Sequence, residues 1–113
     1  AFYYCESLTS ITIPNSVTTI GYHAFYVCTS LTSITIPDSV TSIGEYAFYY
    51  CEKLKTVDME GSYIGSIGMS AFANSGLTYL NVPASVYSIE GNAFYYCLSL
   101  SYSFSYIVPT YTT

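Results

Sequence analysis

Four cysteines recur at one position of a repeating pattern, and thiols are among the side chains most able to bind metal or form covalent links. They are Cys5, Cys28, Cys51 and Cys97, with Ser75 at the same position of the fourth copy. A zinc site needs four converging ligands, often supplied as close pairs such as C-x-x-C, whereas these cysteines occur singly, one per repeat. Neighbouring copies about 5 Å apart would bring two of them within reach of a disulfide. We expect instead buried thiols that pack as small hydrophobic side chains, because serine replaces one of them.

The other ionisable residues offer little chemistry. His23 is the single histidine, and no nucleophile with an orienting group is placed beside it, so we expect a solvated loop residue and not a catalytic base. Asp58 and Glu60 share one face of a predicted strand and could form a weak cation site; the alternative is that they only add solubilising charge. The sequence shows no nucleophile–base pair and no phosphate-binding loop, and we predict a protein without enzymatic activity or cofactor.

Tyrosine is the unusual residue of this sequence, with 15 tyrosines against six phenylalanines and no tryptophan. Seven of them occupy two neighbouring positions of the repeat, which hold Tyr3, Tyr26, Tyr49 and Tyr95 and then Tyr4, Tyr50 and Tyr96. Rings repeated at the spacing of stacked copies can stack with an offset while their hydroxyls reach water. We predict an aromatic surface ladder that either covers the convex side of the fold or makes lateral contacts, since tyrosine is enriched at interfaces.

A repeat of about 23 residues must position all of these side chains. Ala-Phe pairs begin at residues 1, 24, 47, 71 and 93, and a fixed period of this length is the signature of a solenoid. We assign residues 1–113 to a single domain of about five repeats, namely 1–23, 24–46, 47–70, 71–92 and 93–113. Because the sequence opens in the middle of a repeat, we expect it to be an excised or mature part of a longer chain.

Each repeat contains a strand followed by a stop signal. In the first copy Ile11 and Ile13 alternate with polar Ser10 and Thr12, which is the period of a β-strand, and Pro14 ends the pairing. A second short extended segment follows. The sequence Ala-Phe-x-x-Cys then predicts a compact helical turn, in which phenylalanine and cysteine, three residues apart, both face inward.

A unit of this size cannot bury its apolar face alone, so the copies must stack. The strands would then form a parallel ladder with a spacing of about 4.8 Å, joined by right-handed connections, with phenylalanine in a buried column. An insertion at 61–63 and a deletion at 74–76 interrupt the pattern, and we expect the strand at 80–82 to survive. The last copy is degenerate, and we predict its strand at 103–108.

The segment from Ala24 to Gly44 reads AFYVCTSLTSITIPDSVTSIG. Its pattern, AFxxCxxLxxIxIPxSVxxIG, resembles the BspA-like class of leucine-rich repeats, and the resemblance extends over nearly the whole chain. It implies a leucine-rich-repeat-like right-handed coil with a parallel β-sheet on one face and short helical turns and short strands on the other. It also implies an extracellular or cell-surface protein of bacteria or protists that acts in adhesion and binding, not in catalysis.

The polar face of the predicted sheet is the expected binding surface, since solenoids bind ligands on their concave side. Its two columns are Ser10, Ser33, Thr56 and Tyr79, and Thr12, Thr35, Asp58 and Asn81. Small polar groups of this kind suit a protein or glycan ligand. The alternative is a self-assembling structural protein, because repeats without polar caps could stack copy on copy into a filament through open strand edges.

The charge pattern argues against a nucleic-acid partner, and the hydropathy pattern argues against membrane insertion. The net charge is −5, and Lys53 and Lys55 are the only basic residues, so the sequence lacks the basic surface that phosphate binding requires and we predict no nucleic-acid partner. No apolar run approaches the roughly 20 residues needed to span a bilayer, and we predict no membrane insertion.

Overall fold

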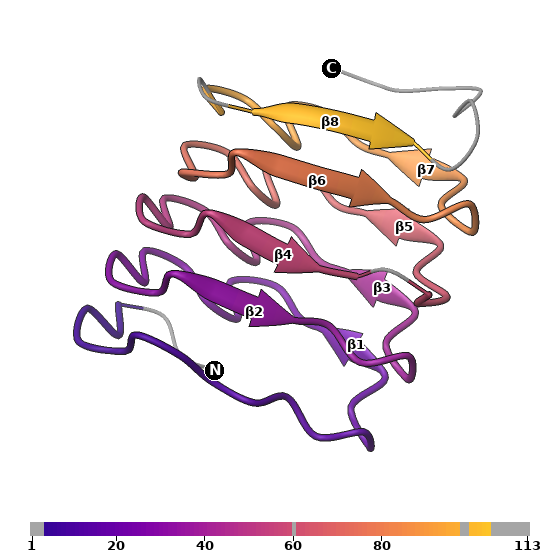
Figure 1. Cartoon of the computed structure of the whole chain (residues 1–113), viewed down its shortest axis with the longest axis horizontal. Coiled ribbons are helices and arrows are strands. Elements are labelled where there is room, and N and C mark those ends of the chain that lie inside the picture. The colour runs from indigo at the N-terminus through magenta and orange to yellow at the C-terminus, as the bar shows by residue number, and fades with distance from the viewer. Residues whose placement is uncertain (1–3, 60, 98–99, 105–113) are drawn as a thin grey trace.

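The computed structural model, which describes residues 4–59, 61–97 and 100–104, is a stack of turns that each contribute short strands to two parallel sheets (Figure 1). One sheet consists, in order, of β1 (Thr19–Ile20), β3 (Ser42–Ile43), β5 (Ser66–Ile67) and β7 (Ser88–Ile89). The other consists of β2 (Ser33–Thr35), β4 (Thr56–Asp58), β6 (Tyr79–Val82) and β8 (Ser101–Phe104). The predicted repeat solenoid with a parallel sheet is confirmed.

The register of the strands reproduces the phase of the repeat. Ile34 of β2 pairs with Val57 of β4, and Ile43 of β3 pairs with Ile67 of β5. Residues at one position of the repeat therefore lie on top of one another, because a parallel ladder places each strand about 4.8 Å from the next.

A column of phenylalanine rings occupies the centre of the stack. The rings of Phe25 and Phe48 have centroids 5.1 Å apart with planes 6° from parallel, Phe48 and Phe72 are 5.1 Å apart at 2°, and Phe72 and Phe94 are 5.7 Å apart at 2°. Phe48 and Phe72 are completely buried. A buried side chain of this size contributes about 1.5–3 kcal/mol, so the column supplies a large share of the stability.

The Ala-Phe-x-x-Cys segments form turns and not the predicted helical turns. The structure contains no helix within its described residues, and so none there that could cross a membrane. The reason is that the backbone donors alternate between two directions. The Cys28 N–H donates within its own turn, to the Phe25 carbonyl at 3.3 Å, whereas the N–H groups of Phe25 and Val27 donate to the carbonyls of Ala47 and Tyr49 in the next repeat, both at 2.7 Å. A helix would keep all of these bonds inside one segment.

Each of these turns contains residues with left-handed backbone conformation, at the position before the alanine and at the third position after it. The described residues with positive φ other than glycine are Tyr4, His23, Val27, Tyr46, Tyr50, Ser70, Asn74, Asn92 and Tyr96. Only the two asparagines and His23 belong to the residue types that are enriched in this conformation. No glycine marks these positions, so the left-handed turns differ from the predicted helical ones without a signal in the residue types.

The first repeat does not form its predicted strand, although its residues 8–14 and residues 31–37 of the second repeat have the identical sequence LTSITIP. The two repeats are joined at Thr32, whose N–H donates to the Thr9 carbonyl at 3.3 Å, and at Thr41, whose N–H donates to the Thr18 carbonyl at 2.8 Å. Between these bonds they are separated by a hollow of about 380 Å³. A second hollow, of about 460 Å³, lies against the apolar side chains of the first repeat itself. Ile11 and Ile13 stay half-exposed, because this segment has at most one neighbouring strand in the described structure.

Two further predictions concern the irregular copies. The fourth copy keeps its strand, β6, as predicted. Its deletion is accommodated at Gly76, where an added Cβ would overlap the Glu52 carbonyl of the previous repeat, so only glycine fits. The last strand, β8, covers 101–104 and not 103–108; residues 105–108 of that prediction lie outside the described part of the chain.

Val27 has φ of 58°, a conformation that β-branched residues disfavour. We expect Val27→Asn to raise the free energy of unfolding by about 1 kcal/mol, because asparagine adopts this conformation at lower cost. Asn74 holds the same position of the repeat with φ of 58°, so Asn74→Val is the matched reverse change and should destabilise. Urea unfolding of both variants measures the effect; a Val27→Asn protein no more stable than the original would contradict it.

Candidate functional site

The outer face of the sheet formed by β2, β4, β6 and β8 carries the predicted polar columns. Ser33 is in register with Thr56, and Thr56 with Tyr79. Thr35 is in register with Asp58. All five side chains are exposed. Tyr79 is the largest of them, and 53% of its surface is accessible.

The remaining predicted residues of this face take different places. Asn81 lies on β6 two residues after Tyr79 and is in register with Ser103 of β8. Ser10 and Thr12 are exposed, but they belong to a segment of the first repeat that forms no strand, across the 380 Å³ hollow from Ser33 and Thr35. The paired part of the polar face therefore begins at β2.

The chemistry of this face is that of hydrogen bonding. It presents hydroxyl groups and one carboxylate, that of Asp58, and exposed Lys55 immediately precedes β4. Glu60, which the sequence places with Asp58 in a weak cation site, lies outside the described residues. Within the described residues, no group of three histidine, cysteine, aspartate or glutamate side chains is arranged to hold a metal ion.

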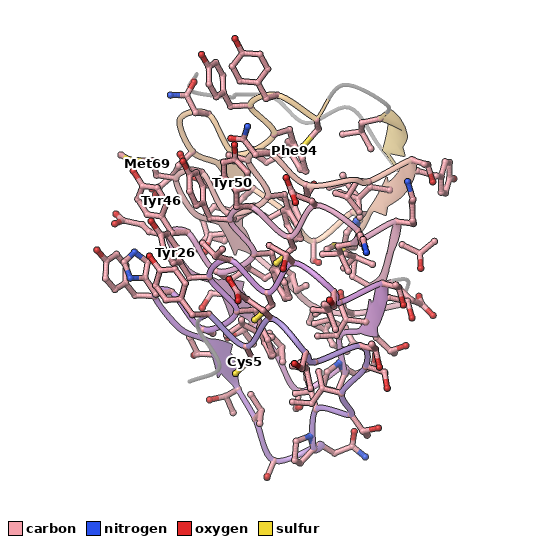
Figure 2. All side chains as sticks on the ribbon, turned by 90° about the vertical axis from the view of Figure 1, so that its left-hand side faces the viewer. Cys5, Tyr26, Tyr46, Tyr50, Met69 and Phe94 are labelled. Carbon is pink, nitrogen blue, oxygen red and sulfur yellow. The ribbon has the colours of Figure 1, made fainter. Side chains whose placement is uncertain are left out.

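A second surface is made by aromatic rings on the turns of the first three repeats. We call it the aromatic patch, and it consists of Tyr4, Tyr22, His23, Tyr26, Tyr46, Tyr49 and Tyr50. Tyr26 and Tyr49 stack at 5.1 Å with planes 15° apart, and Tyr4 meets Tyr26 edge-on at 5.6 Å. Figure 2 shows Tyr26, Tyr46 and Met69 one above another along one edge of the molecule.

The aromatic patch is shorter than the predicted ladder. In the fourth repeat Ala73 and Asn74 occupy the two tyrosine positions, and Tyr95 and Tyr96 beyond them form a separate edge-on pair at 4.5 Å. Tyr3 lies outside the described residues. The described tyrosines of the predicted ladder are thus divided between one cluster and one pair.

His23 lies inside the aromatic patch, where it is half-buried, and is not the solvated loop residue that we predicted. Its ring stacks on Tyr22 at 3.8 Å, lies 4.3 Å from Tyr26, and meets Tyr46 edge-on at 5.5 Å. Sequence analysis missed Tyr22, His23 and Tyr46 as members of this surface. Their position just before Ala-Phe was the available signal, since the left-handed residue there turns the chain toward the tyrosine columns.

The surroundings of Tyr26 within the patch raise the pKa of its hydroxyl. Desolvation raises the pKa of Tyr26, and the neighbouring phenols of Tyr4, Tyr49, Tyr46 and Tyr22 raise the pKa further. A phenol whose pKa lies above its usual value near 10 is uncharged at neutral pH.

The four cysteines are free thiols, and Cys28 and Cys51 are completely buried, as expected for a packing role. The Cys51 Sγ donates to the Phe25 carbonyl of the previous repeat at 3.1 Å, and the Cys97 Sγ donates to the Phe72 carbonyl at 3.0 Å. Burial raises the pKa of Cys51 to about 12. Because the thiolate is the reactive form, this thiol is not a nucleophile at neutral pH.

Stacked turns, a parallel sheet and a buried phenylalanine column define a leucine-rich-repeat solenoid. The model of the family described as "BspA type Leucine rich repeat region (6 copies)" matches residues 1–104. The chain belongs to this family, and the resemblance seen in the sequence is confirmed. No curated protein matches the sequence significantly.

Solved structures of leucine-rich-repeat proteins and of a vaccine antigen have the same fold. The Treponema protein titled T. pallidum leucine rich repeat protein (TpLRR) is 25% identical, with a TM-score of 0.74 over 99% of this chain and 63% of that one. The pneumococcal vaccine antigen PcpA is 27% identical, with a TM-score of 0.71 over 92% of this chain and 30% of that one. A leucine-rich repeat protein from Bacteroides ovatus is 29% identical, with a TM-score of 0.56 over 92% and 34%. The chain therefore spans about a third to two thirds of the length of these proteins.

The raised pKa of Cys51 predicts a stability that depends on alkaline pH. The folded pKa of about 12 exceeds the ordinary value of 9.0, so the folded state favours the protonated thiol. Stability from this group is complete below pH 9 and falls as pH rises from 9 toward 12, by up to about 1.4 kcal/mol per pH unit.

We expect Cys51→Ala to cost about 1–2 kcal/mol at pH 7, since it leaves a small cavity and removes a hydrogen bond. This cost should shrink between pH 9 and 10.5, because alanine does not ionise. Chemical unfolding of the two proteins at each pH measures the difference, in which the ionisation of the tyrosines largely cancels. A difference that stays constant over this range would show that the Cys51 thiol is not desolvated.

Proposed function

We propose that this chain is a non-catalytic binding module of the cell surface, which acts in adhesion and holds a protein or glycan ligand on the outer face of the sheet β2-β4-β6-β8. The observation that carries the proposal is the pair of exposed polar columns in register on consecutive strands, Ser33, Thr56 and Tyr79 beside Thr35 and Asp58. Each strand repeats the same set of hydrogen-bonding positions about 4.8 Å from the last.

The rigidity of the sheet supports a binding role. The strands carry buried Ile34, Val57 and Leu80 on their inner side, which fixes the backbone and keeps the outer side chains on the solvent side of the sheet. A preorganised surface loses less entropy on binding than a flexible one. Tyr79 is the natural anchor, since exposed tyrosine offers ring area and a hydroxyl at low entropic cost.

The comparisons support the location. The chain belongs to a BspA-type family, and one structure of similar fold is a pneumococcal vaccine antigen. An extracellular or cell-surface site is the setting in which an adhesion module would meet its ligand.

The double variant Tyr79→Ala with Asp58→Ala tests the sheet face. We expect it to lower binding to an array of extracellular-matrix proteins and glycans at least tenfold for whichever component the original chain binds, because it removes the anchor ring and the carboxylate. The control is Tyr63→Ala, which removes another exposed tyrosine, 69% accessible, away from this sheet. Unchanged binding by the double variant, with a normal unfolding curve, would rule out the sheet face.

End-to-end self-association is the second candidate function. It is favoured by the first repeat, where Leu8, Ile11, Ile13 and Val17 are half-exposed, although their counterparts in the second repeat are at least 96% buried. A further copy stacked on this end would cover them and extend the sheets into a filament.

Electron microscopy of the purified chain at increasing concentration tests this assembly. We expect filaments that Ile13→Lys abolishes, because a charge would be buried in the contact, while Tyr63→Lys on an exposed loop leaves them intact. Discrete monomers at high concentration would exclude this candidate without affecting the first.

A further inference from the structure

We propose that the aromatic patch is a second binding surface, which takes a cationic segment of a partner protein by stacking its arginine or lysine side chains on the tyrosine rings. The patch lies on the turns of the first three repeats and uses none of the residues of the sheet face. Several of its rings are open to solvent: Tyr22 is 63% exposed, Tyr4 60% and Tyr50 38%. A continuous exposed aromatic surface of this kind marks an interaction site more often than scattered single side chains do.

The rings support one another and leave their outer sides available. Tyr26 contacts Tyr4, His23, Tyr46 and Tyr49, with centroid distances from 4.3 to 6.2 Å. This network holds the inner rings in place, so that little side-chain freedom is lost when a ligand docks. Exposed Met69, which Figure 2 shows beyond Tyr46 on the same edge, extends the apolar surface toward the fourth repeat.

Exposed acidic residues adjoin the patch along the chain and select the charge of its partner. Glu45 is exposed, directly precedes Tyr46, and accepts the His23 N–H on its backbone carbonyl at 3.1 Å. Glu6 is exposed two residues after Tyr4, and its N–H donates to the Tyr4 carbonyl at 2.9 Å. The whole chain has a net charge of −5, so the field around the patch attracts cations and repels anions.

The face of a tyrosine ring also favours a cation. Its quadrupole is negative above and below the plane, and an ammonium or guanidinium group within about 6 Å of the centroid is attracted to it. Arginine fits best, because its planar guanidinium can stack on a ring while it donates hydrogen bonds to a carboxylate at the border. A neutral ligand would gain nothing from Glu6 and Glu45, and an anionic one would be opposed by both.

The repeat pattern limits the length of the segment. The patch ends at the fourth repeat, where Ser70 and Ala73 stand at the positions of Tyr46 and Tyr49. Three turns at a spacing of about 4.8 Å give a surface on the order of 10–15 Å, which matches three to five extended residues. The fitting partner is therefore a short basic stretch and not a broad basic face.

Fluorescence anisotropy with a labelled nona-arginine peptide tests this site in about 50 mM salt. We expect Tyr22→Leu and Tyr46→Leu each to weaken binding by about 2- to 30-fold, the range of a single cation–π contact, and Tyr22→Phe to keep it, because phenylalanine retains the ring. Glu45→Gln should weaken binding and reduce its dependence on salt. Tyr63→Leu, which removes an exposed tyrosine outside the patch, should have no effect.

The outcomes separate this site from the sheet face. Binding that survives Tyr22→Leu and Tyr46→Leu in folded protein overturns the proposal, as does equal binding of a nona-glutamate peptide. Loss of binding in the sheet-face variant Tyr79→Ala, with the patch variants unaffected, would place the cation on the sheet and also overturn it. Self-association that Tyr22→Leu abolishes, without any binding of nona-arginine, would assign the patch to a second copy of the chain and not to a cationic partner.

Discussion

The structure depends on one constraint, which is that every turn must lie in register on the turn before it. Backbone hydrogen bonds impose this at three places in each repeat: in the two sheets and along the turns, where Phe25 donates to Ala47 and Phe48 to Ala71. Once the turns are in register, each position of the repeat becomes a column. Inward columns must then be apolar and of matching size, and the nearly parallel phenylalanine rings are the clearest case.

The same constraint fills the interior with side chains and leaves the surfaces as the places where a ligand could bind. The interior is filled by phenylalanine, leucine and isoleucine columns, and the cysteines pack with them. Buried Cys51 and half-buried Cys97 donate to carbonyls of the preceding repeat. Outward columns are free of packing demands. They have diverged into a polar sheet face and an aromatic patch, two surfaces with different chemistry on one scaffold.

Irregular repeats show how much variation the register tolerates. The deletion in the fourth repeat is absorbed by Gly76, which allows close approach to the Glu52 carbonyl, and the serine at the cysteine position still contacts its neighbour, Cys97, at 3.3 Å. The outer columns change more freely, because no neighbour fixes the size of an exposed side chain. The replacement of tyrosine by Ala73 interrupts the aromatic surface while the core beneath it continues through Phe72.

The sequence by itself determined the period, the columns, the buried phenylalanines and thiols, the family and the polar face, because all of these follow from residue types recurring at fixed intervals. Tertiary structure alone decided the rest. The seven-residue segment LTSITIP contains β2 in the second repeat and no strand in the first. A strand forms only where a neighbouring strand pairs with it, and the segment's own sequence does not supply that neighbour. Val27 and Tyr50 adopt a left-handed backbone conformation because half of the N–H groups in their turns bond to the next repeat. That turn geometry also brought His23, Tyr22 and Tyr46 into the aromatic patch.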